Sequence, residues 1–440
     1  MDVEENAVNA AYLQVEFFSN QKSVAIPTTP FAIPDSASHE SLNALLSAVL
    51  EQEEKEDGKE NSETKSTPFD FLIDGTLLRV PLREYIDQRG IGTESVIRIE
   101  CVIREPAPSP DQDIAHDDWI SSVRTTDRYI ISGCYDNSAY VWSRSGQLLA
   151  SASGHTGSVK CLALVGNNTL LSDKQDMRFV TGSQDQTLML WKIESEGKGK
   201  KKLKVVNTQL FRGHERSVEC VATNSDGTLM VSGSFDSFLK VWNIQESDES
   251  TVVANAKKRK TDDDQSVTKT PMVTLSGHRD AVVGVCWSPT SAKEVITASW
   301  DHSIIVWDLE LAGQQSSLVG TKSFTSVSVS PISGNLLTGS VDQHVRLWDP
   351  RSKEGSMVKQ TFTSHTGWVS CVNWSPTKDH LFVSASFDKV LKLWDTRSPK
   401  TPLYDMTGHS DRILTCDWRA PELIASGGVD GTVKTFKKDL

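Results

Sequence analysis

The stretch "TASWDHSIIVWD" places a hydroxyl, a carboxylate and an imidazole close together, at Thr297, Asp301 and His302. A second histidine, His278, lies upstream in "SGHRD". These are the three groups of a hydrolase site, in which a base must lie within hydrogen-bond reach of the nucleophile. The same groups also suit a buried hydrogen-bonded chain, because a buried carboxylate needs donors. Spacing within one segment does not separate catalysis from structure.

The pattern around Asp301 recurs along the chain. The repeated pattern is a Ser or Thr, three residues, an Asp, five residues and then a Trp. It occurs seven times, and in one copy Phe replaces the Trp. The turn aspartates are Asp136, Asp185, Asp236, Asp301, Asp342, Asp388 and Asp430. A catalytic constellation occurs once per active site, whereas a structural device can recur in every repeat. Repetition therefore favours structure over catalysis, and His302 is interpreted as an exposed turn residue rather than a base.

The sequence pattern of each repeat is typical of strands joined by tight turns. "FVTGSQDQTLMLW" and "LLTGSVDQHVRLWD" flank small polar residues with β-branched and aromatic ones. Residues 105–440 resemble the WD40 family in spacing, in the Gly-His pairs, in the turn Asp and in terminal Trp-Asp pairs such as Trp307-Asp308. The resemblance implies a mainly β, seven-bladed propeller of four-stranded blades. It also implies a buried structural tetrad in each blade, which is His278, Thr297, Asp301 and Trp307 in the fourth.

Three units depart from this pattern. The first has "AHDDW" with His116 in place of Gly-His, the fifth has no histidine, and the seventh ends in Phe436 instead of Trp. We expect these three blades to be less tightly bonded. Family propellers close by pairing an early strand with the last blade, which here falls near residues 105–115. The sequence there, "EPAPSPDQDIA", is a poor strand.

Composition limits the other classes of function. The net charge of −12 argues against a broad grip on nucleic acid, which needs a positive face. The seven cysteines include no C-x-x-C pair, which indicates free thiols in a reducing compartment and neither a disulfide framework nor a zinc site. The chain lacks the features of a secretory signal and any apolar run long enough to span a membrane. We expect a soluble intracellular protein without a cofactor or metal of its own.

A long insert separates the third and fourth units, at about residues 245–271. Its mixed charge predicts a disordered loop. Within it, Lys257, Lys258, Arg259 and Lys260 form a basic cluster of the kind that nuclear import receptors bind, although a solvated loop without specific function explains them equally well. A second basic run, residues 197–204, could contact RNA phosphates.

Residues 10–104 do not follow the propeller repeat. "YLQVEFFS" and "SVAIP" read as strands, "HESLNALLSAVLEQ" as an amphipathic helix, "PFDFLIDGTLLRVPL" as a strand pair and "SVIRIECVI" as a last strand. This β-β-α-β-β order fits a small α+β ubiquitin-like (β-grasp) domain, with a flexible charged insert at about 52–67 and a disordered start at 1–9. Because the last strand runs into "REPAPSP" without a terminal Gly-Gly, the domain is interpreted as a docking module.

The whole chain resembles the WD-repeat ribosome biogenesis proteins of the PeBoW complex, with a Notchless-type front domain. The motifs are "FDFLIDGTLLRVPL", "HDDWISSV", "SHTGWVSCVNWSPT" and "LWDTRSPKTPLYD". The resemblance implies a non-enzymatic factor of nucleus, nucleolus and nucleoplasm, which joins Pescadillo and the Block-of-proliferation WD protein on precursors of the large (60S) ribosomal subunit and acts in pre-rRNA processing. Direct contact with pre-rRNA is left open, and no membrane is involved.

The resemblance also implies a docking residue in the front domain. In this family an acid before the last strand completes the metal adhesion site of the AAA ATPase Midasin, which removes the factor from pre-ribosomes. The matching residue in "RGIGTESVIRIE" is Glu94. A carboxylate oxygen suits Mg²⁺, a hard cation, and that metal belongs to the partner. The competing interpretation is an ordinary surface glutamate at the start of a strand.

Two other functions compete with this one. A Notchless-type 60S factor shares the front domain but carries eight propeller units, against the seven counted here. A WD40 substrate receptor of a ubiquitin ligase would suit the ubiquitin-like domain, but no segment for binding a cullin adaptor is evident. An enzyme fits least, since no nucleotide loop, metal-ligand cluster or unique nucleophile stands out.

Overall fold

The computed structural model describes residues 12–20, 26, 29–57, 68–92, 96–166, 177–195, 203–245, 266–351 and 358–439. The chain divides into two compact units, residues 1–106 with 397–401, and residues 107–396 with 402–440. Among the described residues, no helix has the length and apolar character needed to cross a membrane. All seven cysteines are free thiols.

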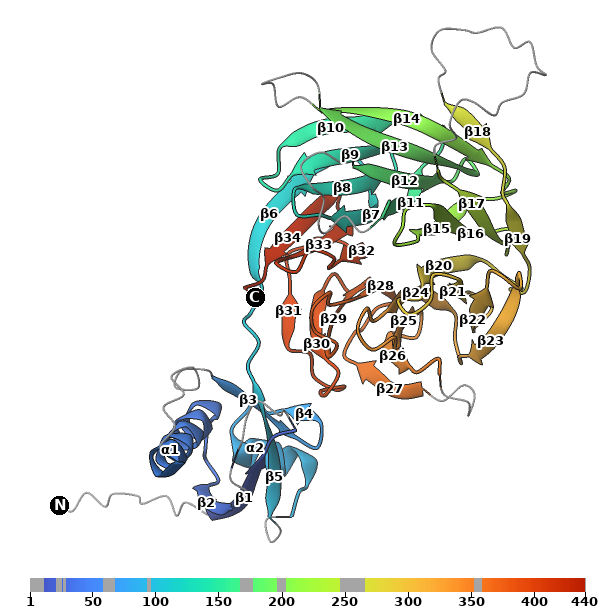
Figure 1. Cartoon of the computed structure of the whole chain (residues 1–440). Helices are drawn as coiled ribbons and strands as arrows, with labels where there is room; N and C mark the ends of the chain where they lie inside the picture. Colours follow the sequence, from blue (N-terminus) through green and yellow to red (C-terminus); the bar gives the residue numbers. More distant parts are fainter. Residues whose placement is uncertain are drawn as a thin grey trace, which may run out of the picture. The chain divides into compact units, whose positions relative to one another are not determined.

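The first unit combines one five-stranded sheet with two helices (Figure 1). The sheet order is β2-β1-β5-β3-β4, with β1 and β5 parallel and the other pairs antiparallel, as a β-grasp fold requires. The elements are β1 (Tyr12–Phe18), β2 (Pro30–Pro34), α1 (His39–Asp57), β3 (Phe69–Ile73), β4 (Thr76–Leu77), α2 (Leu82–Arg89) and β5 (Ile97–Ile103).

Alternation along β1 and helical spacing along α1 build the core of this unit. Leu13, Val15 and Phe17 are buried while the residues between them are exposed or half-buried, as the two-residue period of a strand dictates. Leu42 and Leu46 lie one helical turn apart on α1 and are fully buried in the same cluster. The helix therefore covers one face of the sheet.

Three details of the front domain differ from the prediction. The second strand is β2, Pro30–Pro34, whereas Ile26 of the predicted "SVAIP" lies outside any strand. Helix α1 continues to Asp57, so the charged segment predicted to be flexible from about residue 52 begins as helix. Helix α2 was missed because its eight residues are mostly polar, although Pro81 before it and the left-handed Gly90 after it are helix-boundary signals.

A buried ion-pair network joins α1, β3 and the residue after β5. Asp70 is 1% exposed and accepts hydrogen bonds from Arg104 Nε at 3.0 Å and from His39 Nε2 at 3.1 Å. Arg79 Nη1 lies 3.7 Å from the same carboxylate. Burial disfavours the charged form of Asp70, but the His39 and arginine contacts outweigh it and lower the pKa of this carboxyl.

The second unit contains seven sheets arranged around a common centre (Figure 1). Their innermost strands β7, β11, β15, β20, β24, β28 and β32 contact one another in a closed ring. This confirms the predicted mainly β propeller and its blade number. Blade 1 contains β7 (Ile120–Thr125), β8 (Tyr129–Cys134), β9 (Ser138–Ser143) and β10 (Leu148–Ser153). Blade 2 contains β11 (Val159–Leu164), β12 (Arg178–Ser183), β13 (Thr187–Ser195), β14 (Leu203–Arg212) and β18 (Val267–Lys269). Blade 3 contains β15 (Val218–Thr223), β16 (Leu229–Ser234), β17 (Leu239–Asn243) and β19 (Val273–Leu275).

Blades 4 to 7 follow the same antiparallel order. Blade 4 contains β20 (Val282–Trp287), β21 (Glu294–Ser299), β22 (Ser303–Asp308) and β23 (Gly313–Val319), and blade 5 contains β24 (Phe324–Val329), β25 (Leu336–Ser340), β26 (His344–Trp348) and β27 (Val358–Thr363). Blade 6 contains β28 (Val369–Trp374), β29 (Leu381–Ser386), β30 (Leu391–Asp395) and β31 (Tyr404–Met406). Blade 7 contains β32 (Ile413–Asp417), β33 (Leu423–Gly428), β34 (Thr432–Lys437) and β6 (Ser109–Ala115).

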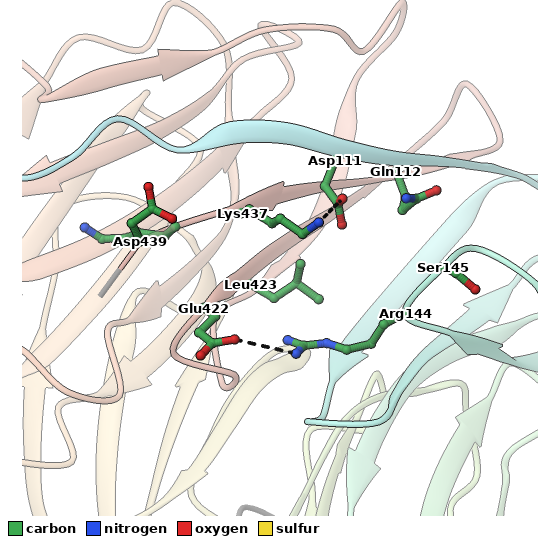
Figure 2. Close-up of a pocket in the computed structure, with 9 residues that line it drawn as sticks. Asp111, Gln112, Arg144, Ser145, Glu422, Leu423, Lys437 and Asp439 are labelled. Atoms are coloured by element: carbon green, nitrogen blue, oxygen red, sulfur yellow. Dashed lines mark ion pairs between the residues drawn. The ribbon is translucent and has the colours of Figure 1, made fainter.

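The last blade is completed by a strand from the front of the propeller. Although "SPDQDIA" is a poor strand by sequence, it forms β6 and pairs antiparallel with β34. Side chains add to the ladder: the Gln112 amide donates to Thr435 Oγ1 at 3.0 Å, and Lys437 Nζ lies 2.8 Å from Asp111 (Figure 2). Tertiary pairing therefore overrides a weak local preference for strand.

Part of the predicted 245–271 insert is ordered. Residues 267–269 form β18, which adds in parallel to β14 and gives blade 2 a fifth strand. Lys269 Nζ donates to the carbonyl oxygens of Asn243 at 3.0 Å and Gln245 at 2.6 Å, so both ends of the insert are held together. The prediction of a disordered loop was wrong for this part, and residues 246–265 lie outside the described ones.

Replacing Asp70 by alanine should destabilise the front domain selectively. The change leaves Arg104 and His39 without their buried acceptor, which we expect to cost about 3–5 kcal/mol of unfolding free energy at pH 7. The folded pKa of Asp70 is lowered, so its contribution is present above pH ~4 and is lost as pH falls toward the folded pKa. Urea unfolding followed by circular dichroism at pH 7 and pH 3 measures both effects, and an equal loss at both pH values would contradict this account.

Candidate interaction surfaces

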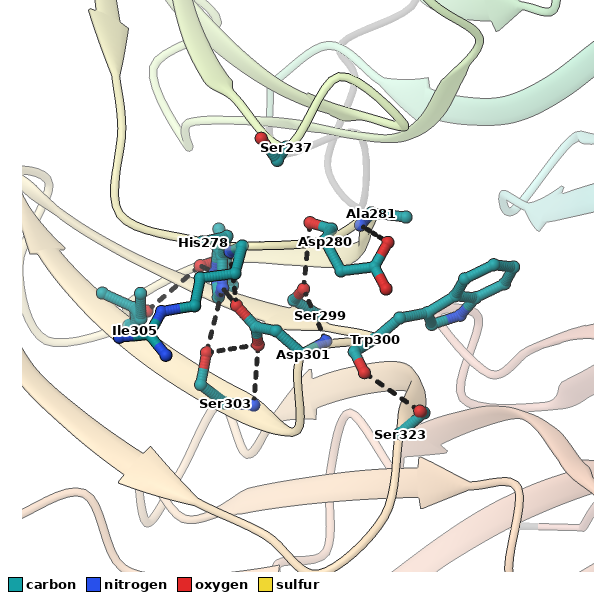
Figure 3. Close-up of polar contacts among 12 residues, drawn as sticks. Ser237, His278, Asp280, Ala281, Ser299, Trp300, Asp301, Ser303, Ile305 and Ser323 are labelled. Atoms are coloured by element: carbon teal, nitrogen blue, oxygen red, sulfur yellow. Dashed lines mark hydrogen bonds and ion pairs between the residues drawn. The ribbon is translucent and has the colours of Figure 1, made fainter.

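The fourth blade contains a continuous chain of hydrogen bonds. Trp307 Nε1 donates to Thr297 Oγ1 at 2.8 Å, and that hydroxyl lies 2.7 Å from His278 Nε2. His278 Nδ1 donates to Asp301 Oδ2 at 2.9 Å (Figure 3). Ser303 Oγ also donates to Asp301. The structure thus brings together all four residues of the tetrad inferred from the repeat.

Burial and charge show what this chain can do chemically. Thr297 is fully buried, so no substrate reaches its hydroxyl. Burial opposes the charge of Asp301, but hydrogen bonds from His278, Ser303 and the Arg279 amide outweigh it and hold the pKa of Asp301 well below its ordinary value. The chain of donors therefore holds a charged carboxylate in place and fixes the turn, while the hydroxyl that would have to act as a nucleophile is buried.

Three more blades repeat the whole chain. In blades 2, 3 and 6 the histidine Nδ1 lies 2.7–2.9 Å from the turn aspartate, and the indole lies 2.8 Å from the hydroxyl. The pKa of Asp388 in blade 6 falls to about 2, because His365 and two amides outweigh the effect of burial. These tetrads are His155, Thr181, Asp185 and Trp191; His214, Ser232, Asp236 and Trp242; and His365, Ser384, Asp388 and Trp394.

Blades 1, 5 and 7, whose sequences depart from the repeat, lack part of the tetrad. In each of them the turn aspartate has another donor or keeps its histidine. In blade 1, Tyr140 Oη donates to Asp136 at 2.6 Å, while His116 turns to the Ile114 carbonyl. In blade 5, which lacks the histidine, the guanidinium of Arg346 holds the turn aspartate. Blade 7 keeps both histidine bonds and lacks only the indole donor.

The residue after each turn aspartate has a positive φ. His302 has φ 68°, and the same left-handed conformation recurs at Asn137, Gln186, Ser237, Gln343, Lys389 and Gly431. Its backbone is set by the turn, and the residue is half-buried, whereas it was predicted to be exposed. His302 is therefore a turn residue outside the tetrad.

The tetrads define one face of the propeller, here called the histidine face, which carries the blade histidines and turn aspartates. Exposed aromatic residues gather on it from two repeat positions: the third residue after the histidine, and the residue before the aspartate. Trp119, Trp300 and Trp368 are 41%, 40% and 52% exposed. Each contacts a second aromatic ring on the same face, namely Tyr135, Phe235 and Phe387.

Basic side chains and a shallow hollow accompany these rings. Lys160 Nζ lies 4.2 Å from the Tyr135 ring centre, and the Arg412 guanidinium lies 5.5 Å from that of Phe387. A hollow of about 370 Å³ is lined by Glu215, Arg216, Phe235, Asp236, Ser237, Arg279 and Asp280. Exposed tryptophans with arginine and polar rims are typical of protein-binding surfaces. The repeat positions of these aromatics were readable in the sequence, but their clustering was not predicted.

Two predicted sites lie outside the described residues. Glu94 falls between helix α2 and strand β5, and the basic cluster Lys257–Lys260 falls within the 246–265 segment. The structure therefore does not place either of them, and both stay predictions. Within the described part of the chain, no group of three or more His, Cys, Asp or Glu side chains is arranged to hold a metal ion.

Comparison with known proteins gives the family. Residues 13–86 match the NLE (NUC135) domain, residues 110–143 match the WD domain, G-beta repeat, and residues 143–421 match the MIOS WD40 repeat model. The chain is 50% identical to the "Ribosome biogenesis protein WDR12 homolog" of Brugia malayi, over 94% of this chain and 93% of the relative. The chain belongs to this WDR12 family. The predicted family is thereby confirmed.

Other WDR12 homologs align over nearly their whole length. The homolog of Ixodes scapularis is 40% identical, over 97% of this chain and 99% of its own length. That of Aedes aegypti is 38% identical, over 97% and 96% respectively. The NLE match covers most of the front domain and the two WD matches cover most of the propeller, so the two-part architecture is shared with the family.

Removing the turn carboxylate of blade 4 should lower the unfolding free energy more than removing the turn carboxylate of blade 5. In Asp301→Ala the buried His278 and two backbone amides lose their acceptor, so we expect a loss of about 3 kcal/mol in unfolding free energy. Asp342→Ala, whose partner is the more accessible Arg346, is the matched control and should lose about 1 kcal/mol. Urea unfolding at pH 7, followed by tryptophan fluorescence, measures both.

The difference should also depend on pH. Because the folded pKa of Asp301 is lowered, its stabilisation is complete above pH ~4 and fades as pH falls toward the folded pKa. The stability of wild type and Asp301→Ala should therefore converge in acid. A penalty for Asp301→Ala no larger than that for Asp342→Ala would refute the role assigned to the tetrad.

Proposed function

We propose that the protein is a non-enzymatic assembly factor in ribosome biogenesis, acting on the large (60S) subunit and in pre-rRNA processing. Its relatives carry ribosome biogenesis in their names. The histidine face supports a scaffold, because it offers exposed aromatics beside a polar hollow that Phe235 also lines. On this proposal the protein works in the nucleus, nucleolus and nucleoplasm.

The partners in this proposal divide between the two units. The propeller holds Pescadillo and the Block-of-proliferation WD protein, with the histidine face as the contact surface. The front domain docks on the metal adhesion site of the Midasin AAA ATPase, with Glu94 completing the coordination of the partner's Mg²⁺. Docking then leads to removal of the factor from precursor particles.

The competing functions have less support. The propeller unit contains seven sheets among the described residues, which disfavours a Notchless-type factor with eight units. A substrate receptor of a ubiquitin ligase remains a second candidate, because exposed tryptophans on a propeller face would also serve to hold substrates. Purification from nuclear extract separates the two: we expect Pescadillo in the eluate, whereas a ligase receptor would bring cullin adaptors.

Truncating the exposed tryptophans should weaken assembly of the complex. We expect Trp300→Ala with Trp368→Ala to lower affinity for the Pescadillo–Block-of-proliferation pair at least 30-fold, since buried aromatic anchors contribute about 2 kcal/mol or more each. Leu311→Ala is the matched control, because Leu311 is 81% exposed but lies in the turn between β22 and β23, at the opposite end of its blade. Equal affinities of both variants, measured by calorimetry, would exclude the histidine face as the contact surface.

Glu94 should be required for release and not for assembly. We expect Glu94→Gln to abolish Mg²⁺-dependent binding to the Midasin adhesion domain and to trap the factor on pre-ribosomes, while folding and Pescadillo binding stay normal. Asp87→Asn removes a carboxylate from an exposed position on α2 and is the matched control. Normal release of the Glu94→Gln protein, measured by sedimentation of nuclear extracts, would contradict the docking role of Glu94.

A further inference from the structure

A very short tether leads from the front unit into the propeller. The Arg104 amide donates to the Pro68 carbonyl at 2.8 Å, and its side chain bonds to Asp70, so the front unit is anchored up to this residue. Strand β6 begins only five residues later, at Ser109. Pro106 and Pro108 lie between them and restrict the backbone. Tension on the front unit therefore passes to β6 with little slack.

Strand β6 is held in its blade only by non-covalent contacts. Its ladder partner β34 lies more than 300 residues away in sequence, and this β6–β34 pair is here called the seam. In blade 6, by contrast, the corresponding strands β30 and β31 are joined by a short connection. The seam is consequently the place where the strand pairing that ties the two ends of the propeller together can be undone without breaking the chain.

The end of the seam nearest the tether is the weaker one. Ser109 pairs with Lys437 there, Pro110 has no amide hydrogen to donate, and the register shifts between Lys434 and Phe436. The main side-chain contact at this end is the ion pair of Asp111 with Lys437, whose side chain is 65% exposed. Exposed ion pairs contribute little, about 0–1 kcal/mol.

Solvent reaches this end of the seam directly. Figure 2 shows a pocket between β6, β34 and the β9–β10 turn, with Asp111, Lys437 and Arg144 in its wall. Its volume is about 610 Å³. The far end differs, because Ile114 is 3% exposed and the His116 amide donates to the Gly431 carbonyl at 2.7 Å. Opening would therefore start at Ser109 and proceed toward Ala115.

The alternative outcome of tension is unfolding of the front unit, and its topology resists this. Strand β5, which leads into the tether, is the central strand of its sheet and pairs with β1 on one side and β3 on the other. Strand β6 pairs on one side only, with β34. Of the two strands that share the load, β6 has fewer bonds to break.

We propose that tension applied to the front domain peels β6 from β34, starting at Ser109, before either unit unfolds, and leaves the ring closed by the contacts of β32 and β33 with β7. Loss of β6 would disturb the histidine face, because the blade 7 aspartate lies in the turn that begins β34. The mechanical property belongs to the fold itself, whereas its use in removing the factor from precursor particles rests on the proposed function.

Single-molecule pulling on the full chain tests the peeling. Handles attached through azidophenylalanine at positions 87 and 311 load the tether from exposed sites in the two units. We expect a first, reversible step of about 2–3 nm, the contour length of the seven residues of β6. A first step of about 6–7 nm, the contour length of the front-unit residues between the handle at position 87 and Pro106, would overturn the proposal.

A disulfide across the seam gives a matched pair of variants. Asp113→Cys with Lys434→Cys replaces an ion pair between register partners, and its oxidation should shorten the first step to about 1 nm, because only residues 109–112 can still peel. Reduction should restore the full step. Lys392→Cys with Asp405→Cys replaces the corresponding ion pair of blade 6, 2.8 Å long, and should leave the step unchanged. Persistence of the full step in the oxidised seam variant would also overturn the proposal.

A release assay separates this inference from the proposed function. With purified precursor particles and ATP, the oxidised seam variant should be released at least tenfold more slowly than wild type, while the blade 6 variant is released normally. Equal release of both variants would refute the role of peeling in release. Absence of release for wild type itself would refute the proposed function and leave the pulling result standing.

Discussion

The buried turn aspartate is the constraint on which the propeller depends. A carboxylate removed from water is unfavourable unless donors surround it, and blades 2, 3, 4 and 6 meet this requirement with the same set of side chains. In blade 4, His278 connects the turn aspartate to a hydroxyl on β21 and an indole on β22. One connected chain therefore fixes the strand register, the turn and the approach of the preceding loop.

This requirement explains which departures the fold accepts. Blade 5 has no histidine, but Arg346 supplies charge-assisted hydrogen bonds to the turn aspartate. Blade 1 uses the phenol of Tyr140 for the same purpose. The donors are interchangeable as long as the buried charge is satisfied, and blade geometry is kept although the side chains differ.

The functional surfaces follow from the same device. Because the tetrads orient both the loop before each blade and its central turn, the residues next to them share one face. That is why Trp300, beside Asp301, and Trp368, three residues after His365, both emerge on the histidine face. The front domain adds a separate unit, from which the chain leads straight into the closing strand of the propeller; residues 397–401, between β30 and β31, also belong to that unit.

The sequence by itself determined the features that repeat or that are local. Seven spaced aspartates specified the blades, and alternation and helical spacing specified β1 and α1, because these signals lie within a few residues of one another. Family membership also followed from the sequence. The sequence analysis did not predict the short polar helix α2 or the exact bounds of β2. Their local sequence signals are weak, and their positions depend on packing against the rest of the sheet.

Only the tertiary structure decided the long-range pairings. Strand β6 has a poor strand sequence and pairs with β34 across most of the chain, and β18 adds to β14 although the sequence of the insert predicted a disordered loop. The pairing of exposed Trp300 with Phe235 of the neighbouring blade likewise appears only once the blades pack side by side. Periodicity reports how a segment folds, whereas ladder partners and surface clusters depend on residues far away in sequence, and that information is not local.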